Sequence, residues 1–171
     1  KKIFRPGETI ESQSLQTFPG GKGANQSVAA ARAGGRVYHA GSIGKDGEWM
    51  LDKLRNEGIN VSNVVISKAV TGHAVIQVDH EGENAICLFG GANQTITRSD
   101  IDKTIKQFKA GSTLMVQNET SELAYMLHTA ARHNMFICLN PSPISESLLT
   151  LDLKDVSLLV VNEIEAKTLV P

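Results

Sequence analysis

Patterns typical of membrane-bound, secreted or nucleic-acid-binding proteins are missing from this sequence of 171 residues. No apolar run approaches the roughly 20 residues that a membrane-spanning helix needs, and no signal peptide opens the chain. The net charge of -1 and the lack of a basic tract give no reason to expect nucleic acid as a partner. We therefore expect a globular protein that acts on neither membranes nor nucleic acids.

Cysteine and histidine are too scarce and too scattered to indicate a metal site. The two cysteines, Cys87 and Cys138, lie in apolar runs without metal-ligand spacing. The five histidines show no ligand spacing either, and we expect them at surfaces or interfaces. Reduced core thiols of this kind indicate a cytoplasmic protein, although a redox role stays open.

Two familiar nucleotide-binding patterns are also absent. Gly44-Lys45 is followed by Asp46, where a phosphate loop requires Ser or Thr, and no strand leads into a GxGxxG turn. In addition, the first methionine is Met50, and the chain stops at Pro171 just as a helix develops after Asn162. We therefore expect this chain to be an internal portion of a longer protein.

The order of apolar segments after residue 20 is typical of an α/β fold, because strand-length runs alternate with segments of helical period. The pattern predicts helices over 24–33, 48–57, 99–108 and 121–133, and strands over 37–43, 113–117, 136–139 and 158–161. The third helix has Thr97 or Ser99 as its expected cap. Apolar strands placed between helices indicate a parallel sheet covered on both faces.

Two segments depart from this alternation, and we expect them to form a lid. Residues 8–18 and 73–90 are strand-like with no helix inside them. The second segment contains two apolar runs on either side of a turn at Gly82, which is a hairpin signal. We predict a small antiparallel sheet that projects from the α/β body.

The most informative segment is Pro19–Gln26, which leads into a helix of small residues. Its glycines permit positive φ angles and close approach of another surface to the backbone. The first turn of a helix carries unpaired N–H donors and a partial positive charge, and Lys22 and Asn25 add polar side chains. A packing helix after a tight turn is the alternative, but the whole octet favours a site for a hydroxyl-rich or anionic small molecule.

This segment, Gly20-Gly21-Lys22-Gly23-Ala24-Asn25-Gln26, resembles the first signature of the ribokinase-like (phosphofructokinase-B type) carbohydrate kinase family. The resemblance runs along nearly the whole chain, through Gly41–Gly47, Gly82–Asn84, Gly90–Asn93, Asn118-Glu119, Asn140–Pro143 and Asn162–Glu165. It implies a three-layer α/β/α parallel sheet with a small β lid. Residues 1–171 would be an incomplete domain of this kind, truncated at both ends, with lid strands at approximately 8–18 and 73–90.

The resemblance also implies a role in sugar binding for seven residues. Those expected to contact or enclose the sugar are Gly21, Lys22, Gly23, Asn25, Glu119, Ala92 and Asn93. Glu119 would accept hydrogen bonds from the sugar, and Ala92 and Asn93 would close the pocket from the lid. The place of Glu119 at the carboxyl end of a predicted parallel strand agrees independently, because ligands of open α/β sheets lie at that edge.

The resemblance places two further residues near the nucleotide. Asn162 would lie near the phosphates of ATP, and Glu165 near the water shell of magnesium, an ion that prefers oxygen ligands. The alternative is structural, because Asn162 is also a plausible helix cap and an acidic residue complements the helix dipole. For Asp46 two interpretations stay open: it orients the neighbouring glycine turn, or it is a solvated carboxylate of that turn.

The activity implied is ATP-dependent phosphorylation of a primary hydroxyl of a small sugar, with ribose as the first candidate. Mg²⁺ and a monovalent cation such as K⁺ would assist, and a homodimer would form through the lid. The catalytic aspartate of the family lies in a G-A-G-D motif that these residues lack. The base is therefore expected beyond Pro171, and the segment alone is expected to be inactive. The alternatives are a catalytically inactive sugar-binding or regulatory protein of the same fold, and a nucleoside kinase.

Overall fold

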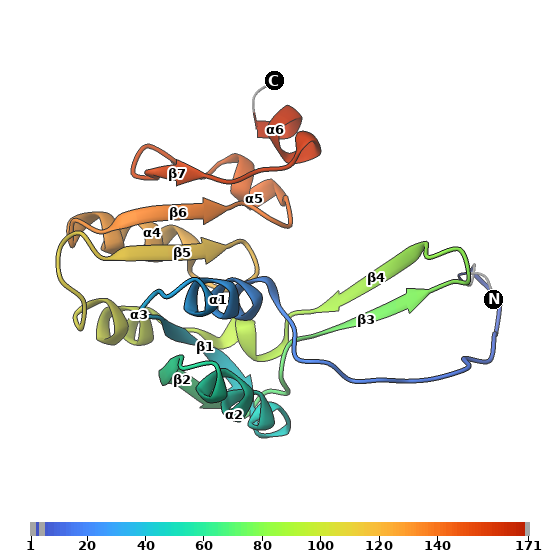
Figure 1. Ribbon diagram of the computed structural model, residues 1–171. Helices are drawn as coiled ribbons and strands as arrows, with labels where there is room; N and C mark the ends of the chain where they lie inside the picture. The colour runs from blue at the N-terminus through green and yellow to red at the C-terminus, as the bar shows by residue number, and fades with distance from the viewer. Residues whose placement is uncertain (1–2, 4–5, 170–171) are drawn as a thin grey trace.

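A computed structural model of the chain describes residue 3 and residues 6–169, and it consists of an α/β body with a projecting hairpin (Figure 1). In the body, β1 (Tyr38–Gly44) pairs in parallel with β2 (Asn60–Ser67). A second parallel sheet has the order β5 (Thr113–Gln117), β6 (Phe136–Asn140) and β7 (Leu158–Leu159). Within the described part of the chain, no backbone ladder joins β1 to β5.

The main core lies on one face of the second sheet. Two helices, α3 (Arg98–Ile105) and α4 (Leu123–Arg132), pack their apolar sides against Val116, Ile137 and Leu139 of the strands. Ile137 and Leu139 are fully buried. Because burying one such side chain contributes about 1.5–3 kcal/mol, this face is the main source of stability in the body.

A smaller apolar cluster lies beside the first sheet. It is built by α2 (Trp49–Asn56) and the start of β2, with Leu51, Leu54, Ile59 and Val61 at its centre. The helix α1 (Lys22–Arg32) packs half-buried residues against this cluster and also contacts β1 and β5. Helices thus lie on both faces of β5, which confirms the α/β/α fold class.

Short elements fill the connections. They are the 3-10 turns η1 (Lys45–Gly47) and η2 (Gly91–Thr95) and the helices α5 (Glu146–Leu149) and α6 (Glu163–Leu169). The turn η1 lies at the glycine turn expected beside Asp46, whereas η2 was not expected from the sequence. No helix formed by the described residues is long and apolar enough to cross a bilayer.

The hairpin β3 (His73–Val78) and β4 (Asn84–Phe89) projects from the body as expected, with antiparallel pairs such as Ile76 with Ile86. The lid strand expected at residues 8–18 does not form. Residues 8–18 have no strand assignment, and Figure 1 shows them as an extended segment that returns to α1. The reason is the lack of a paired neighbour: within the described residues β3 and β4 pair only with each other, and no strand ladder supplies backbone partners to residues 8–18.

Candidate functional site

The glycine-rich segment ends at an open helix start. Gly21 is the N-cap of α1 with φ 93°, a conformation that a residue with a Cβ rarely adopts, and no side chain caps the helix. The carbonyl of Gly21 accepts the first helical bond from Asn25 N at 3.0 Å. The N–H groups of the first turn therefore have no intrahelical acceptor, and the exposed Asn25 side chain lies one turn away.

An ion pair joins this helix start to the end of β5. Glu119 lies two residues beyond the strand, and its Oε1 pairs with Nζ of Lys22, 97 positions away in sequence. The side chains are 37% exposed for Lys22 and 22% exposed for Glu119. The structure thus brings two of the predicted sugar-binding residues into direct contact, with both side chains partly exposed to solvent.

The turn η2 lies against the same carboxylate residue. Gln94 Nε2 donates to the backbone oxygen of Glu119 at 2.8 Å, and Ser121 N donates to the backbone oxygen of Asn93 at 3.1 Å. Ala92 is fully buried, and its N–H donates to Val70 O at 2.8 Å. Asn93 is therefore brought to the edge of the site, whereas the side chain of Ala92 packs beneath it.

The surface beneath the helix start contains two residues that were not selected in the sequence analysis. Gln117, the last residue of β5, is buried, and its amide donates to Oε1 of Gln26. His39 of β1 has Nδ1 2.9 Å from the Ser27 hydroxyl. Burial lowers the pKa of His39, so the neutral ring is favoured. The only available signal was that both residues lie in segments predicted to be strands.

Asp46 holds the base of the hairpin. Its Oδ1 accepts hydrogen bonds from both N and Oγ1 of Thr71, each at 3.0 Å, two residues before β3 begins. These bonds, the backbone one first, hold the pKa of Asp46 below its ordinary value. The residue therefore connects η1 to the hairpin instead of pointing into the site.

Asn162 and Glu165 form a reciprocal cap at the start of α6. Asn162 N donates to Glu165 Oε2 at 3.0 Å, and Glu165 N donates to Asn162 Oδ1 at 2.8 Å. Glu165 is buried, with 7% exposure. The structural alternative considered for these residues is therefore present, and their role at a nucleotide stays a prediction. No group of three or more His, Cys, Asp or Glu in the described ranges could hold a metal ion.

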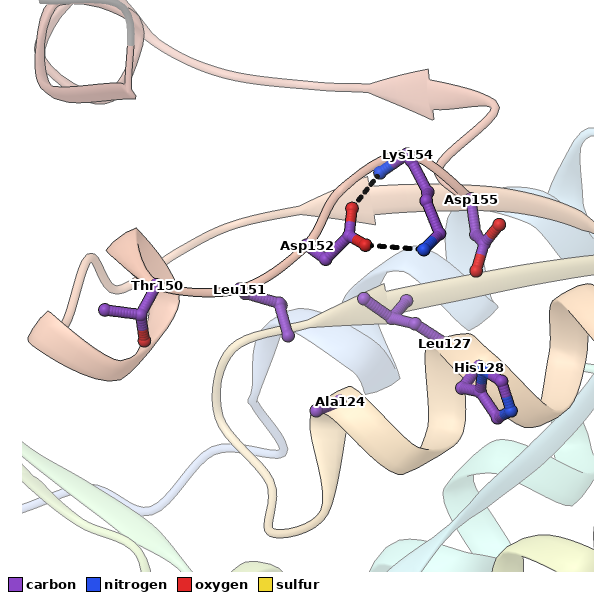
Figure 2. Close-up of a pocket in the computed structure, with 8 residues that line it drawn as sticks. All are labelled: Ala124, Leu127, His128, Thr150, Leu151, Asp152, Lys154 and Asp155. Carbon is purple, nitrogen blue, oxygen red and sulfur yellow. Dashed lines mark hydrogen bonds and ion pairs between the residues drawn. The ribbon is translucent and has the colours of Figure 1, made fainter.

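A hollow of about 310 Å³ lies elsewhere, between α4 and the chain that follows α5 (Figure 2). Leu127 and His128 form one wall, and Asp152 and Lys154 form part of another. These two charges neutralise one another, with Lys154 Nζ 2.8 Å from Asp152 Oδ2. None of the predicted site residues lines this hollow, so the candidate site remains at the start of α1 and the end of β5.

Comparison with known proteins gives a match along the whole chain. Residues 1–171 match the family model described as pfkB family carbohydrate kinase. The chain is 36% identical to the ribokinase of Haemophilus influenzae over 173 residues, which covers 96% of this chain and 55% of that protein. The chain thus spans about half the length of the curated relatives it matches.

Solved structures show the same fold. The chain superposes on ribokinase from Cryptococcus neoformans in complex with ADP with a TM-score of 0.79 and 39% identity, over 98% of this chain and 54% of that one. For Arabidopsis thaliana ribokinase complexed with ribose and ATP the TM-score is 0.77 and the identity 25%, over 98% and 56%. With a family model matched from end to end and relatives that share both sequence and fold, this chain belongs to the pfkB family of carbohydrate kinases.

Proposed function

We propose that the complete gene product transfers the terminal phosphoryl group of ATP to the primary hydroxyl of ribose, giving ribose 5-phosphate. The observation that carries this proposal is the Lys22–Glu119 contact, which joins a glycine-rich helix start to the carboxyl edge of a parallel sheet. Support comes from relatives named ribokinase and from the Arabidopsis relative solved with ribose and ATP. Ligands of open α/β sheets lie at this edge.

The residues of this chain would bind the sugar through complementary donors and acceptors. A carboxylate accepts from more than one hydroxyl, so Glu119 would hold two neighbouring alcohol groups. The Lys22 ammonium and the first-turn N–H groups of α1 would donate to the sugar oxygens, and Asn25 can donate and accept. Because Lys22 and Glu119 are already paired, both side chains are held in place before the sugar arrives, which lowers the entropic cost of binding.

The nucleotide end of the proposed site is less complete in this chain. Asn162 Oδ1 accepts from Glu165 N, so only the NH₂ group of Asn162 would be offered to a phosphate of ATP. Glu165 Oε2 accepts from Asn162 N, so the second carboxylate oxygen would be the one offered to a water molecule of magnesium. Among the described residues no group of three or more His, Cys, Asp or Glu could hold a metal ion directly, and we derive no step from Mg²⁺ or K⁺. No residue of the chain is assigned as the catalytic base.

The proposal is tested by titrating D-ribose into the complete gene product in a calorimeter. We expect saturable binding, and we expect Asn25→Ala to weaken it about tenfold, because one lost hydrogen bond to the sugar corresponds to roughly 1–1.5 kcal/mol. Asn56→Ala, at the exposed end of α2, is the matched control and should bind like wild type.

The outcomes of this titration and of an ATP turnover assay separate the alternatives. Ribose-dependent ATP hydrolysis or phosphoryl transfer supports the kinase, whereas ribose binding without turnover supports an inactive sugar-binding protein. Turnover with adenosine or inosine but not with ribose supports a nucleoside kinase. Absence of saturable ribose binding, or equal affinities for wild type and Asn25→Ala, contradicts the proposed site.

We also propose that the hairpin mediates a homodimer. Ile76, Val78, Ile86 and Leu88 lie on one face of the hairpin by their register, and each is more than half exposed. An exposed apolar patch of this kind typically marks an interaction surface. Sedimentation of the complete gene product should give a dimer that Ile76→Asp/Ile86→Asp converts to a monomer, and a wild-type monomer would refute this.

A further inference from the structure

The position of α1 does not rest on a buried apolar face. None of its residues is fully buried, and no side chain caps its start. Its half-buried apolar residues Ala24, Val28 and Ala31 pack towards the α2 cluster, on the side of the first sheet. This apolar stripe is narrow and only half-buried, so polar contacts are needed in addition to fix the end of α1 that lies near Glu119.

Two side-chain contacts supply this fixation, one from each sheet. Gln26 accepts from the amide of buried Gln117 at the end of β5, and Ser27 bonds to Nδ1 of His39 in β1 at 2.9 Å. The strands β1 and β5 share no backbone ladder among the described residues. The neighbouring residues Gln26 and Ser27 are thus hydrogen-bonded to two separate sheets. These two bonds fix the position of this helical turn and its rotation about the helix axis.

Gly23 shows how closely the helix approaches the surface beneath it. A Cβ added at Gly23 would lie 3.0 Å from Oε1 of Gln117 and 3.8 Å from Cε1 of His39. The former distance is tighter than ordinary van der Waals contact, so only glycine fits there without movement of that surface. The same two side chains therefore bond the helix and set its height above the strands.

We propose that Gln117 and His39 are positioning residues for sugar binding, acting through Gln26 and Ser27 on the first turns of α1. They do not touch the sugar. They hold the N–H groups of the helix start, Lys22 and Asn25 at the distance and angle that the sugar hydroxyls require. Misplacement by a fraction of an ångström weakens every hydrogen bond made from that turn at once. This inference rests on the proposed function.

The test separates positioning from stability by using a substitution that should favour the helix itself. Ser27→Ala removes the bond to His39 but places the best helix former in α1. We expect the KM for ribose to rise about fivefold in Ser27→Ala and in Gln26→Ala, because a displaced helix start would lose about 1 kcal/mol of hydrogen bonding to the sugar. The kcat at saturating ribose and the KM for ATP should stay unchanged, as expected when binding of the sugar is weakened equally in the ground state and the transition state.

A matched control and a rescue variant sharpen this result. The control is Gln107→Ala. Gln107 follows α3, and its Nε2 donates a hydrogen bond of 2.8 Å to Oδ1 of Asn63 in β2, away from the site. Loss of this bond should leave the KM for ribose unchanged. At His39 the amide of Asn can take the place of Nδ1, so His39→Asn should retain ribose binding that His39→Leu loses. Equal KM values in wild type, Ser27→Ala and Gln26→Ala would overturn the inference.

Hydrogen exchange gives a second measurement that needs no activity. The amides of residues 25–28 should exchange several-fold faster in the Ser27→Ala/Gln26→Ala variant, while those of residues 29–32 stay as in wild type. Unchanged exchange at residues 25–28 overturns the inference whatever the enzyme does. If wild type neither binds nor phosphorylates ribose yet exchange rises as expected, the proposed function fails and the fixation of α1 stands.

Discussion

The helices α1 and α4 cover opposite faces of β5, and they are held there in different ways. Leu123, Leu127 and Ala130 of α4 are buried in the main core. On the other face, α1 buries no residue fully and is bonded through polar side chains to Gln117 and His39. One face of the strand therefore carries the stability, and the other carries the candidate site.

This difference has a physical reason. A site for a hydroxyl-rich ligand needs exposed donors and acceptors, which an apolar helix face would bury or remove. A helix held by hydrogen bonds keeps its start open to solvent while its direction stays defined. The expected consequence is that substitutions on α4 change the free energy of unfolding, whereas those around α1 change sugar affinity.

The largest expected effect is on the free energy of unfolding, and it comes from truncating a buried side chain of α4. Leu127→Ala in α4, where the side chain is 3% exposed, should lower the free energy of unfolding of the complete gene product by about 3 kcal/mol. The matched change in α1, Val28→Ala, should lower it by only about 1 kcal/mol, because this side chain is only half-buried. Urea unfolding followed by circular dichroism measures both. Equal losses would remove the contrast between the two helices.

The next largest expected effect is on ribose affinity, and it comes from changing Glu119, the ion-pair partner of α1. Glu119→Gln should weaken ribose binding about tenfold, since the ion pair with Lys22 and the stronger carboxylate bonds to the sugar are both lost. The free energy of unfolding should change by less than about 1 kcal/mol, as is usual for partly exposed ion pairs. Calorimetric titration and urea unfolding of the same variant give the two numbers.

Glu57→Gln is the control for this variant. Glu57 also pairs with a residue of α1, since Arg32 Nε lies 2.8 Å from its Oε2, but this pair is at the far end of the helix. Its loss should leave ribose affinity unchanged. A loss of affinity as large as that of Glu119→Gln would mean that any weakening of α1 reduces binding, and that Glu119 has no direct role.

Much of the fold was accessible from the sequence because local patterns and burial agree there. The strand at 113–117 was predicted with its observed bounds, and the helix expected at 24–33 is α1. Thr97 is the cap of α3, one of the two candidates named. The strand β2 was not predicted, because Asn60, Ser62 and Asn63 interrupt its apolar pattern while its pairing with β1 supplies the order.

The candidate site was only partly accessible, for a different reason. Lys22 was named from the glycine-rich helix start and Glu119 through the family resemblance, and the structure brings their side chains into contact. The roles of His39 and Gln117 depend on which side chains of β1 and β5 face α1. These two strands belong to different sheets and are far apart in sequence. A histidine without ligand spacing carries no local signal of this kind. Tertiary polar contacts of this type become visible only once the strands are placed.

The smallest expected effect compares the starts of α1 and α3. In α3 a capping box is complete: Asp100 accepts from Thr97 Oγ1 at 2.6 Å and from Thr97 N at 3.0 Å, whereas α1 has no side-chain cap. The side-chain bond from Thr97, followed by the backbone bond, lowers the pKa of Asp100 below 3.8. Its contribution to stability is therefore present above the unfolded pKa and is lost as pH falls through the lower folded value.

At pH 7, the free energy of unfolding of Asp100→Asn should be about 0.5–1 kcal/mol lower than that of wild type. This lies at the low end of the range for loss of a helix cap, because the carboxylate is close to solvent. At pH 3 and below, this difference should shrink as the wild-type carboxylate takes up a proton. Urea midpoints of both proteins at pH 7, 4 and 3 measure the trend. Asp52→Asn on α2, which loses only an exposed pair with Arg55, should change stability by less than about 0.5 kcal/mol. The stability difference between Asp100→Asn and wild type could instead stay constant from pH 7 to 3. The ionised carboxylate would then not be the group that caps α3. In that case the contrast with α1 would depend on Thr97 alone.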